Sequence, residues 1–89
     1  MGRSVPPWRT RVEDELGRLV PYRRALTTTD QHALDHLMNE VRQRRAAGGM
    51  LPAANAREVM LLNMLVGVMG RLERLEQHLR SLREGQDDD

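Results

Sequence analysis

Leucine recurs at alternating steps of four and three residues through the second half of the chain. In a helix, this spacing places the side chains on one narrow stripe, as the a and d positions of a coiled coil do. We call this stripe the seam; it consists of Leu61, Leu65, Val68, Leu72, Leu75, Leu79 and Leu82. Because one helix cannot cover such a stripe, the pattern predicts a partner helix, most simply from a second copy of the chain.

The helix that carries the seam is expected over residues 56–84, and its two halves differ. Between Val59 and Met69 nearly every face is apolar, so we expect other helices to surround this half. From Arg71 onward only the seam is apolar, which predicts a short coiled-coil stem of roughly 20 Å. The alternative is that the first two helices cover the whole seam within one chain. Self-association is favoured because those helices are already needed around the first half.

Two glycines lie off the seam of this helix. With Leu65 at heptad position a, Gly67 is at c and Gly70 is at f. Glycine costs about 1 kcal/mol against alanine in a helix interior, so its presence needs a reason. We expect both glycines to let another helix approach closely; the alternative is that they only loosen the helix.

The charges beside the seam leave the orientation of the coil open. In a parallel pair, Arg71 at g faces Glu76 at e, which is attractive, whereas His78 facing Arg83 is not. Leucine at both a and d does not fix the number of helices, and no asparagine at an a position sets the register.

The N-terminal part of the chain predicts a first helix over residues 6–20. Its apolar face consists of Trp8, Val12, Leu16 and Leu19. Pro6 and Pro7 suit a first helical turn, and Pro21 is expected to interrupt the helix, although Gly17 already weakens it. Residues 22–26 are expected to form a connector or a final turn.

A second helix is expected over residues 29–47. Thr28 followed by Gln31 has the spacing of a capping box, with Thr27 and Thr29 as alternative caps. The apolar face of this helix consists of Leu34, Leu37, Met38 and Val41. Gly48 and Gly49 end it. Asn55 with Glu58 repeats the capping pattern at the start of the last helix.

Composition agrees with a single all-α domain over residues 1–89, with a three-helix core and an acidic tail at 85–89. The chain has 89 residues, no phenylalanine, one tryptophan, one tyrosine and six methionines, a composition poor in strand-forming residues. A core of this size is marginal by itself, and dimerisation would stabilise it. The absence of cysteine excludes disulfides and thiolate metal sites.

The first residues show no signal-peptide pattern, and the longest apolar run spans about half a membrane. We therefore expect no membrane association and a cytoplasmic location.

Positive charge is concentrated near the N-terminus. All fourteen basic residues of the chain are arginines, and the net charge is +1. The candidates for phosphate contacts are Arg3, Arg9, Arg11, Arg23 and Arg24. Two copies would bring enough cations together for salt-sensitive nucleic-acid binding, whereas the alternative is ordinary solvated arginine among acidic neighbours. No known DNA-reading motif is present, because the loop after the second helix is too long for a helix-turn-helix.

His32 and His36 are four residues apart, a spacing that lets two imidazoles share a metal ion on a helix. Helical geometry places both roughly opposite Leu34 and the apolar face. No third ligand is evident, so we expect a solvated face and no metal site.

The acidic residues Glu13, Asp14 and Glu15 are consecutive and fan out around a helix, so they cannot form a two-carboxylate site. Ser4 and Ser81 have no neighbouring base. We therefore expect no enzymatic activity and no cofactor.

Three segments carry a resemblance to a known group of proteins. The start Met1-Gly2-Arg3-Ser4-Val5-Pro6, the block 22–26 and the residues 30–38 resemble small uncharacterised archaeal helical proteins with a Met-Gly-Arg-Thr-Val-Pro start. The resemblance implies an archaeal, cytoplasmic origin and a three-helix fold, and it implies no activity. Gly48-Gly49-Met50-Leu51 replaces a more variable loop of that group, so no loop function carries over.

Together these features predict a non-enzymatic assembly or adaptor protein that dimerises through the seam and presents its N-terminal part in two copies. The alternative is a small nucleic-acid-associated protein that uses the N-terminal arginines.

Overall fold

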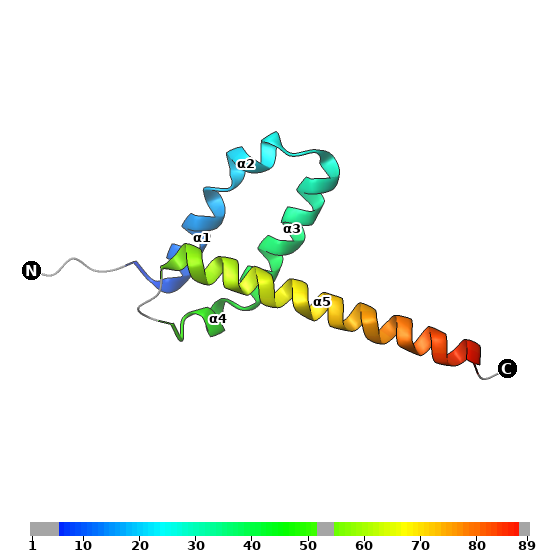
Figure 1. Ribbon diagram of the computed structural model, residues 1–89. Coiled ribbons are helices and arrows are strands. Elements are labelled where there is room, and N and C mark those ends of the chain that lie inside the picture. Colours follow the sequence, from blue (N-terminus) through cyan, green and yellow to red (C-terminus); the bar gives the residue numbers. More distant parts are fainter. Residues whose placement is uncertain (1–5, 52–54, 88–89) are drawn as a thin grey trace, which may run out of the picture.

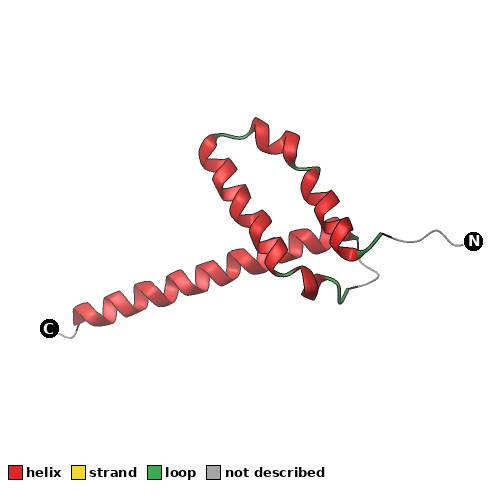
Figure 2. Cartoon of the chain, turned by 180° about the vertical axis from the view of Figure 1, so that it is seen from behind, coloured by secondary structure: helices red, strands yellow, loops and turns green. Residues whose placement is uncertain are grey.

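The computed structural model describes residues 6–51 and 55–87, and it is all-α over both ranges. Its helices are α1 (Trp8–Gly17), α2 (Val20–Ala25), α3 (Thr28–Gln43), α4 (Arg45–Gly48) and α5 (Ala56–Asp87). Helices α1 and α2 run outward and α3 returns, so that α1 and α3 cross the first half of α5 (Figure 1). The second half of α5 extends away from the other helices, as the view from behind also shows (Figure 2).

The molecule is long and flat. Its principal extents are 73 × 32 × 14 Å, and its radius of gyration is 17.7 Å, against about 12 Å for a compact domain of this length. Packed helices lie 8–10 Å apart, and the Cα atoms of each lie about 2.3 Å from its axis, so 14 Å holds two helix layers. One layer is α5, and α1 to α4 form the other. Within the part of the chain that the structure describes, α5 is therefore covered on one side only.

The expected first helix, 6–20, is wrong at both ends. Helix α1 begins at Trp8, with Pro7 at the N-cap position and not in the first turn. Helix α1 stops at Gly17, and after a tight turn in which Leu19 N–H donates to the Leu16 carbonyl (3.1 Å), α2 begins at Val20. Pro21 lies in the first turn of α2 and does not interrupt a helix. Proline is tolerated there because the first amide groups of a helix have no intrahelical acceptor.

The expected second helix, 29–47, is divided into α3 and α4 at Arg44, whose φ of −105° and ψ of 16° are not helical. It begins one residue earlier than expected, because Thr27 is the cap: its hydroxyl accepts a hydrogen bond from the Asp30 amide at 3.2 Å. A capping threonine of this kind is worth about 1 kcal/mol.

Helix α4 packs tightly between Trp8 and α5. A Cβ atom on Gly48 would lie 2.8 Å from Cγ1 of Val59 and 3.1 Å from Cζ2 of Trp8, so only glycine fits at this crossing. The Trp8 indole N–H donates to the Arg45 carbonyl at 2.8 Å, which satisfies its one polar atom. Trp8 thus joins the start of α1 to α4.

The core is small and centred on the first half of α5. Its buried members are Val12, Leu16, Val41, Met60 and Met64, and Trp8, Leu19, Leu37 and Met38 pack at its edge. Burial of one such side chain contributes roughly 1.5–3 kcal/mol. The core therefore draws on α1, α3 and α5, as the apolar faces of the sequence predict.

Candidate interaction surface on the C-terminal helix

All seven seam residues lie at the surface. Their side chains are between 38% exposed, at Val68, and 66% exposed, at Leu65. They belong to one continuous helix that begins at Ala56. Asn55, just before it, caps the helix: its side-chain oxygen accepts a hydrogen bond from the Arg57 amide at 2.8 Å. Helix α5 runs to Asp87, whereas the sequence predicted that it would end before Gly85. No other helix within the described residues 6–51 covers the seam.

The expectation that other helices surround residues 59–69 is wrong for a single chain. One face of this segment is buried, with Val59, Met60, Asn63, Met64 and Gly67 turned toward α1, α3 and α4. The opposite side is open because the head supplies only one layer. We define the head as α1 to α4 together with residues 56–70 of α5, and the stem as residues 71–84.

The open side of the head is apolar beyond the seam. Leu62, Val66 and Met69 are 47%, 49% and 55% exposed and form a second strip beside it. In the stem the corresponding positions are charged: Glu73, Glu76, Arg80 and Arg83. A contiguous apolar surface of this kind marks an interaction site. The candidate surface is therefore broad on the head and narrows to the seam along the stem.

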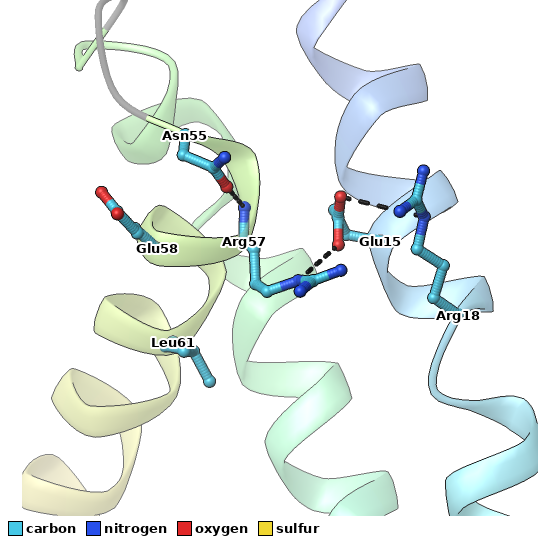
Figure 3. Close-up of a pocket in the computed structure, with 6 residues that line it drawn as sticks. All are labelled: Glu15, Arg18, Asn55, Arg57, Glu58 and Leu61. Atoms are coloured by element: carbon cyan, nitrogen blue, oxygen red, sulfur yellow. Dashed lines mark hydrogen bonds and ion pairs between the residues drawn. The ribbon is translucent and has the colours of Figure 1, made fainter.

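A groove lies beside the seam, between the start of α5 and α1. It has a volume of about 390 Å³ and is lined by Glu15, Arg18, Asn55, Arg57, Glu58 and Leu61 (Figure 3). The Arg57 guanidinium spans it and donates to Glu15 at 3.1 Å, while Arg18 approaches the same carboxylate at 3.9 Å. An adjoining hollow of about 250 Å³ shares four of these residues and adds Leu19 and Met60. The rim of the groove is thus ionic and its inner end apolar.

A buried carboxylate joins α3 to α5 where the head meets the stem. The Glu40 side chain is 6% exposed and binds the guanidinium groups of Arg44 and Arg71, the latter at 3.2 Å. These two hydrogen bonds hold the pKa of Glu40 below its usual value of 4.5. Arg71 also contacts Nδ1 of His36 at 3.3 Å. The cluster holds Arg71 to its own chain.

Gly67 is the one feature of the sequence that pointed to this cluster, but the sequence does not show that Glu40 is the residue it contacts. A Cβ atom on Gly67 would lie 2.7 Å from Cγ of Glu40, so the expected close approach of another helix is confirmed here. At Gly70 it is not: the nearest atom is Nη1 of Arg74, on α5 itself, at 3.4 Å. Glu40 lies at the edge of the apolar face of α3. At such a position the sequence pattern does not tell whether a carboxylate is buried or solvated, so Glu40 was not predicted as a buried residue.

The candidate phosphate-binding arginines that the structure describes lie on two helices, and one of them, Arg23, is engaged by a carboxylate. Arg3 lies outside the described residues, and Arg9 and Arg11 are on α1 whereas Arg23 and Arg24 are on α2. Arg23 forms two hydrogen bonds of 2.8 Å with Asp35, which raise the pKa of Arg23 and lower that of Asp35. The Arg11 guanidinium lies 5.3 Å from the centre of the Trp8 ring.

The basic residues at the end of α3 and the start of α4 are also paired. Arg42 and Arg45 both reach Glu13, at 3.2 and 3.0 Å, and these contacts lower the pKa of Glu13. Glu13 and Glu15 point to different partners, in agreement with the predicted fanning of this acidic run.

The two histidines of α3 are exposed, as expected. His36 contacts Arg71 through Nδ1, and within residues 6–51 and 55–87 no three His, Cys, Asp or Glu side chains are placed to share a metal ion. No helix in the same part of the chain is long and apolar enough to cross a membrane.

These features define a class of protein: a small all-α chain whose longest helix leaves one apolar side uncovered. The chain belongs to the family described as Domain of unknown function (DUF8156), whose model matches residues 1–89. Comparison with curated proteins and with solved structures gave no significant match. The family description names no activity, in keeping with the group that the sequence resembles, and is silent on an archaeal origin and on the Met-Gly-Arg start.

Proposed function

We propose that the protein self-associates through the seam of α5 and serves as a non-enzymatic assembly or adaptor module that presents its head in two copies. The observation that carries this proposal is the uncovered apolar side of α5. Half-exposed leucines recur along it from Leu61 to Leu82, over 22 residues of helix. Covering the exposed half of one leucine is worth about 1 kcal/mol, and two chains would contribute the seam twice.

The stem strengthens the proposal. Residues 71–84 are all exposed, and the hydrogen bonds that tie this segment to the head come from Arg71, at its beginning. An isolated helix of 12–15 residues is marginal in water, so such a stem is expected to persist through pairing with another helix. A second copy supplies a helix of the same length with the same seam.

Nucleic-acid binding is not proposed as the function. Arg23 is engaged by Asp35, and the other candidates among the described residues are divided between α1, with Arg9 and Arg11, and α2, with Arg24. No observation favours a continuous phosphate-binding surface.

The test compares two double variants that add the same negative charge to the stem. Leu72→Glu with Leu79→Glu places carboxylates in the seam, whereas Gln77→Glu with Ser81→Glu places them on the opposite face. Light scattering after size exclusion should give the seam variant the 10.2 kDa mass of one chain. The control variant should keep the larger mass of the unaltered protein.

The fluorescence of Trp8, the one tryptophan of the chain, reports whether the head of each variant is folded. A folded seam variant that retains the mass of the unaltered protein would contradict the proposal. If the seam variant unfolds instead, the milder single change Leu79→Ser should still raise the dissociation constant.

A further inference from the structure

The two flanks of the seam are not equivalent, because the head covers one of them. With Leu65 at a, Arg57 and Arg71 occupy g positions, and both are bound to the head: Arg57 to Glu15 of α1, and Arg71 to Glu40 of α3. The groove between α1 and α5 opens on this g flank (Figure 3). Any helix that pairs with the seam therefore has the head beside it on the g side.

The opposite flank, made of e positions, changes character along α5. In the head its residues are Leu62 and Met69, which are 47% and 55% exposed. In the stem they are Glu76 and Arg83. In a parallel pair the g flank of each helix faces the e flank of the other. Parallel pairing thus places the apolar e residues, Leu62 and Met69, against the partner's head. It places the charged e residues, Glu76 and Arg83, along the partner's stem, which has no head beside it.

An antiparallel pair fits the same residues poorly. There g faces g and e faces e, so in the registers that align the seam, Leu62 meets a charged e residue of the stem, Glu76 or Arg83. Arg71 would then face another Arg71 or His78, whereas in the parallel pair it faces Glu76, its opposite charge. Apolar matching and charge complementarity both favour the parallel arrangement.

We infer that the two copies run parallel and that Leu62 of each copy inserts into the groove between α1 and α5 of the other. This inference rests on the proposed self-association and gives it an orientation. In the parallel register the e residue 62 faces the g residue 57, and Arg57 lines the groove. The apolar inner end at Leu19, Met60 and Leu61 receives the leucine, while Arg57, Arg18 and Glu15 close over it from the rim.

Orientation is tested by cross-linking. The chain contains no cysteine, so Leu82→Cys introduces a single thiol at a d position near the end of the stem. In a parallel pair two such thiols face each other and should form an intermolecular disulfide in a glutathione redox buffer. Gln77→Cys, on the outer face, is the control and should remain monomeric under the same conditions on a non-reducing gel.

Contact with the groove is tested by two matched substitutions. Leu62 and Val66 are almost equally exposed, at 47% and 49%, but only position 62 faces the groove of a parallel partner. Leu62→Gln should raise the dissociation constant about tenfold per site, or about a hundredfold for a dimer that contains the site twice. Val66→Gln should change it no more than about threefold in all.

The outcomes separate the inference from the proposed function. A dimer in which the thiols of Leu82→Cys stay free, or in which Leu62→Gln and Val66→Gln weaken association equally, overturns the inference and leaves self-association intact. An unaltered protein that remains a monomer overturns both.

Discussion

At the scale of single residues, the contact between Gly67 and Glu40 explains how α3 and α5 meet over a charged group. Glycine brings the backbone of α5 against Cβ and Cγ of Glu40, so the carboxylate lies between Arg44 and Arg71. Cβ and Cγ of Glu40 are close to the backbone of α3, so they cannot move aside as the end of a long side chain can. The position therefore has no room for a methyl group.

Two alanine substitutions on α5 should consequently have opposite effects. Gly67→Ala should lower the free energy of unfolding by about 1–3 kcal/mol, because the methyl group overpacks the contact with Glu40. Gly70→Ala, whose Cβ meets only an Nη1 atom of its own helix at 3.4 Å, should raise it by up to about 1 kcal/mol through helix propensity. Chemical denaturation followed by circular dichroism, at one fixed protein concentration, measures both. Equal shifts for the two variants would show that the close approach has no energetic weight.

Prediction from sequence worked best where a residue acts within its own helix. Asn55 caps α5 as expected, and the cap of α3 is Thr27, one of the alternatives to Thr28. It failed where partners come from distant segments: Glu40 with Arg71, and Glu15 with Arg57, are 31 and 42 residues apart. Nothing in the local spacing of such residues specifies the crossing of two helices.

At the scale of elements, α5 is one continuous helix with two supports. Its first half is held by the core and by the contacts of Met60 and Met64. In its second half, residues 71–85 are exposed, and the hydrogen bonds to α3 come from Arg71. The apolar pattern predicted this division, but it did not predict that the first half would be covered on one side alone.

The two halves of α5 should therefore respond differently to dilution. Amide hydrogens of residues 57–67 should keep their protection from exchange at all protein concentrations at which the head is folded. Those of residues 72–84 should be protected at high concentration and should lose most of that protection below the dissociation constant, because the unpaired stem is a marginal helix. Hydrogen exchange read by mass spectrometry distinguishes the segments. Stem protection that does not depend on concentration would mean that the stem needs no partner.

The breaks between the first elements show another limit of periodicity. The apolar face from Trp8 to Leu19 continues through the turn after Gly17, and Leu19 still packs at the edge of the core. Periodicity alone therefore gave one helix where the chain makes a turn. Gly17 and Pro21 both indicated a boundary, and the structure uses the glycine as the end of α1 and the proline in the first turn of α2.

At the scale of the whole molecule, flatness is the decisive property. The molecule has only two helix layers within 14 Å, and α5 is one of them. The side of α5 that faces away from α1 to α4 therefore has no cover, and no further segment of the described chain is placed to supply it. Composition and length predicted an all-α chain with a marginal core, and the fold confirms the all-α class. The two-layer arrangement itself depends on how far α1 to α4 reach around α5, which the sequence does not specify.

The most direct test of this account is the mass of the unaltered chain in solution, measured by light scattering after size exclusion over a range of loading concentrations. The account predicts twice the 10.2 kDa mass of one chain at high concentration, falling toward 10.2 kDa on dilution. The mass should change little with added salt, because the seam is apolar. A constant 10.2 kDa at every concentration would contradict self-association and would mean that a different protein covers α5.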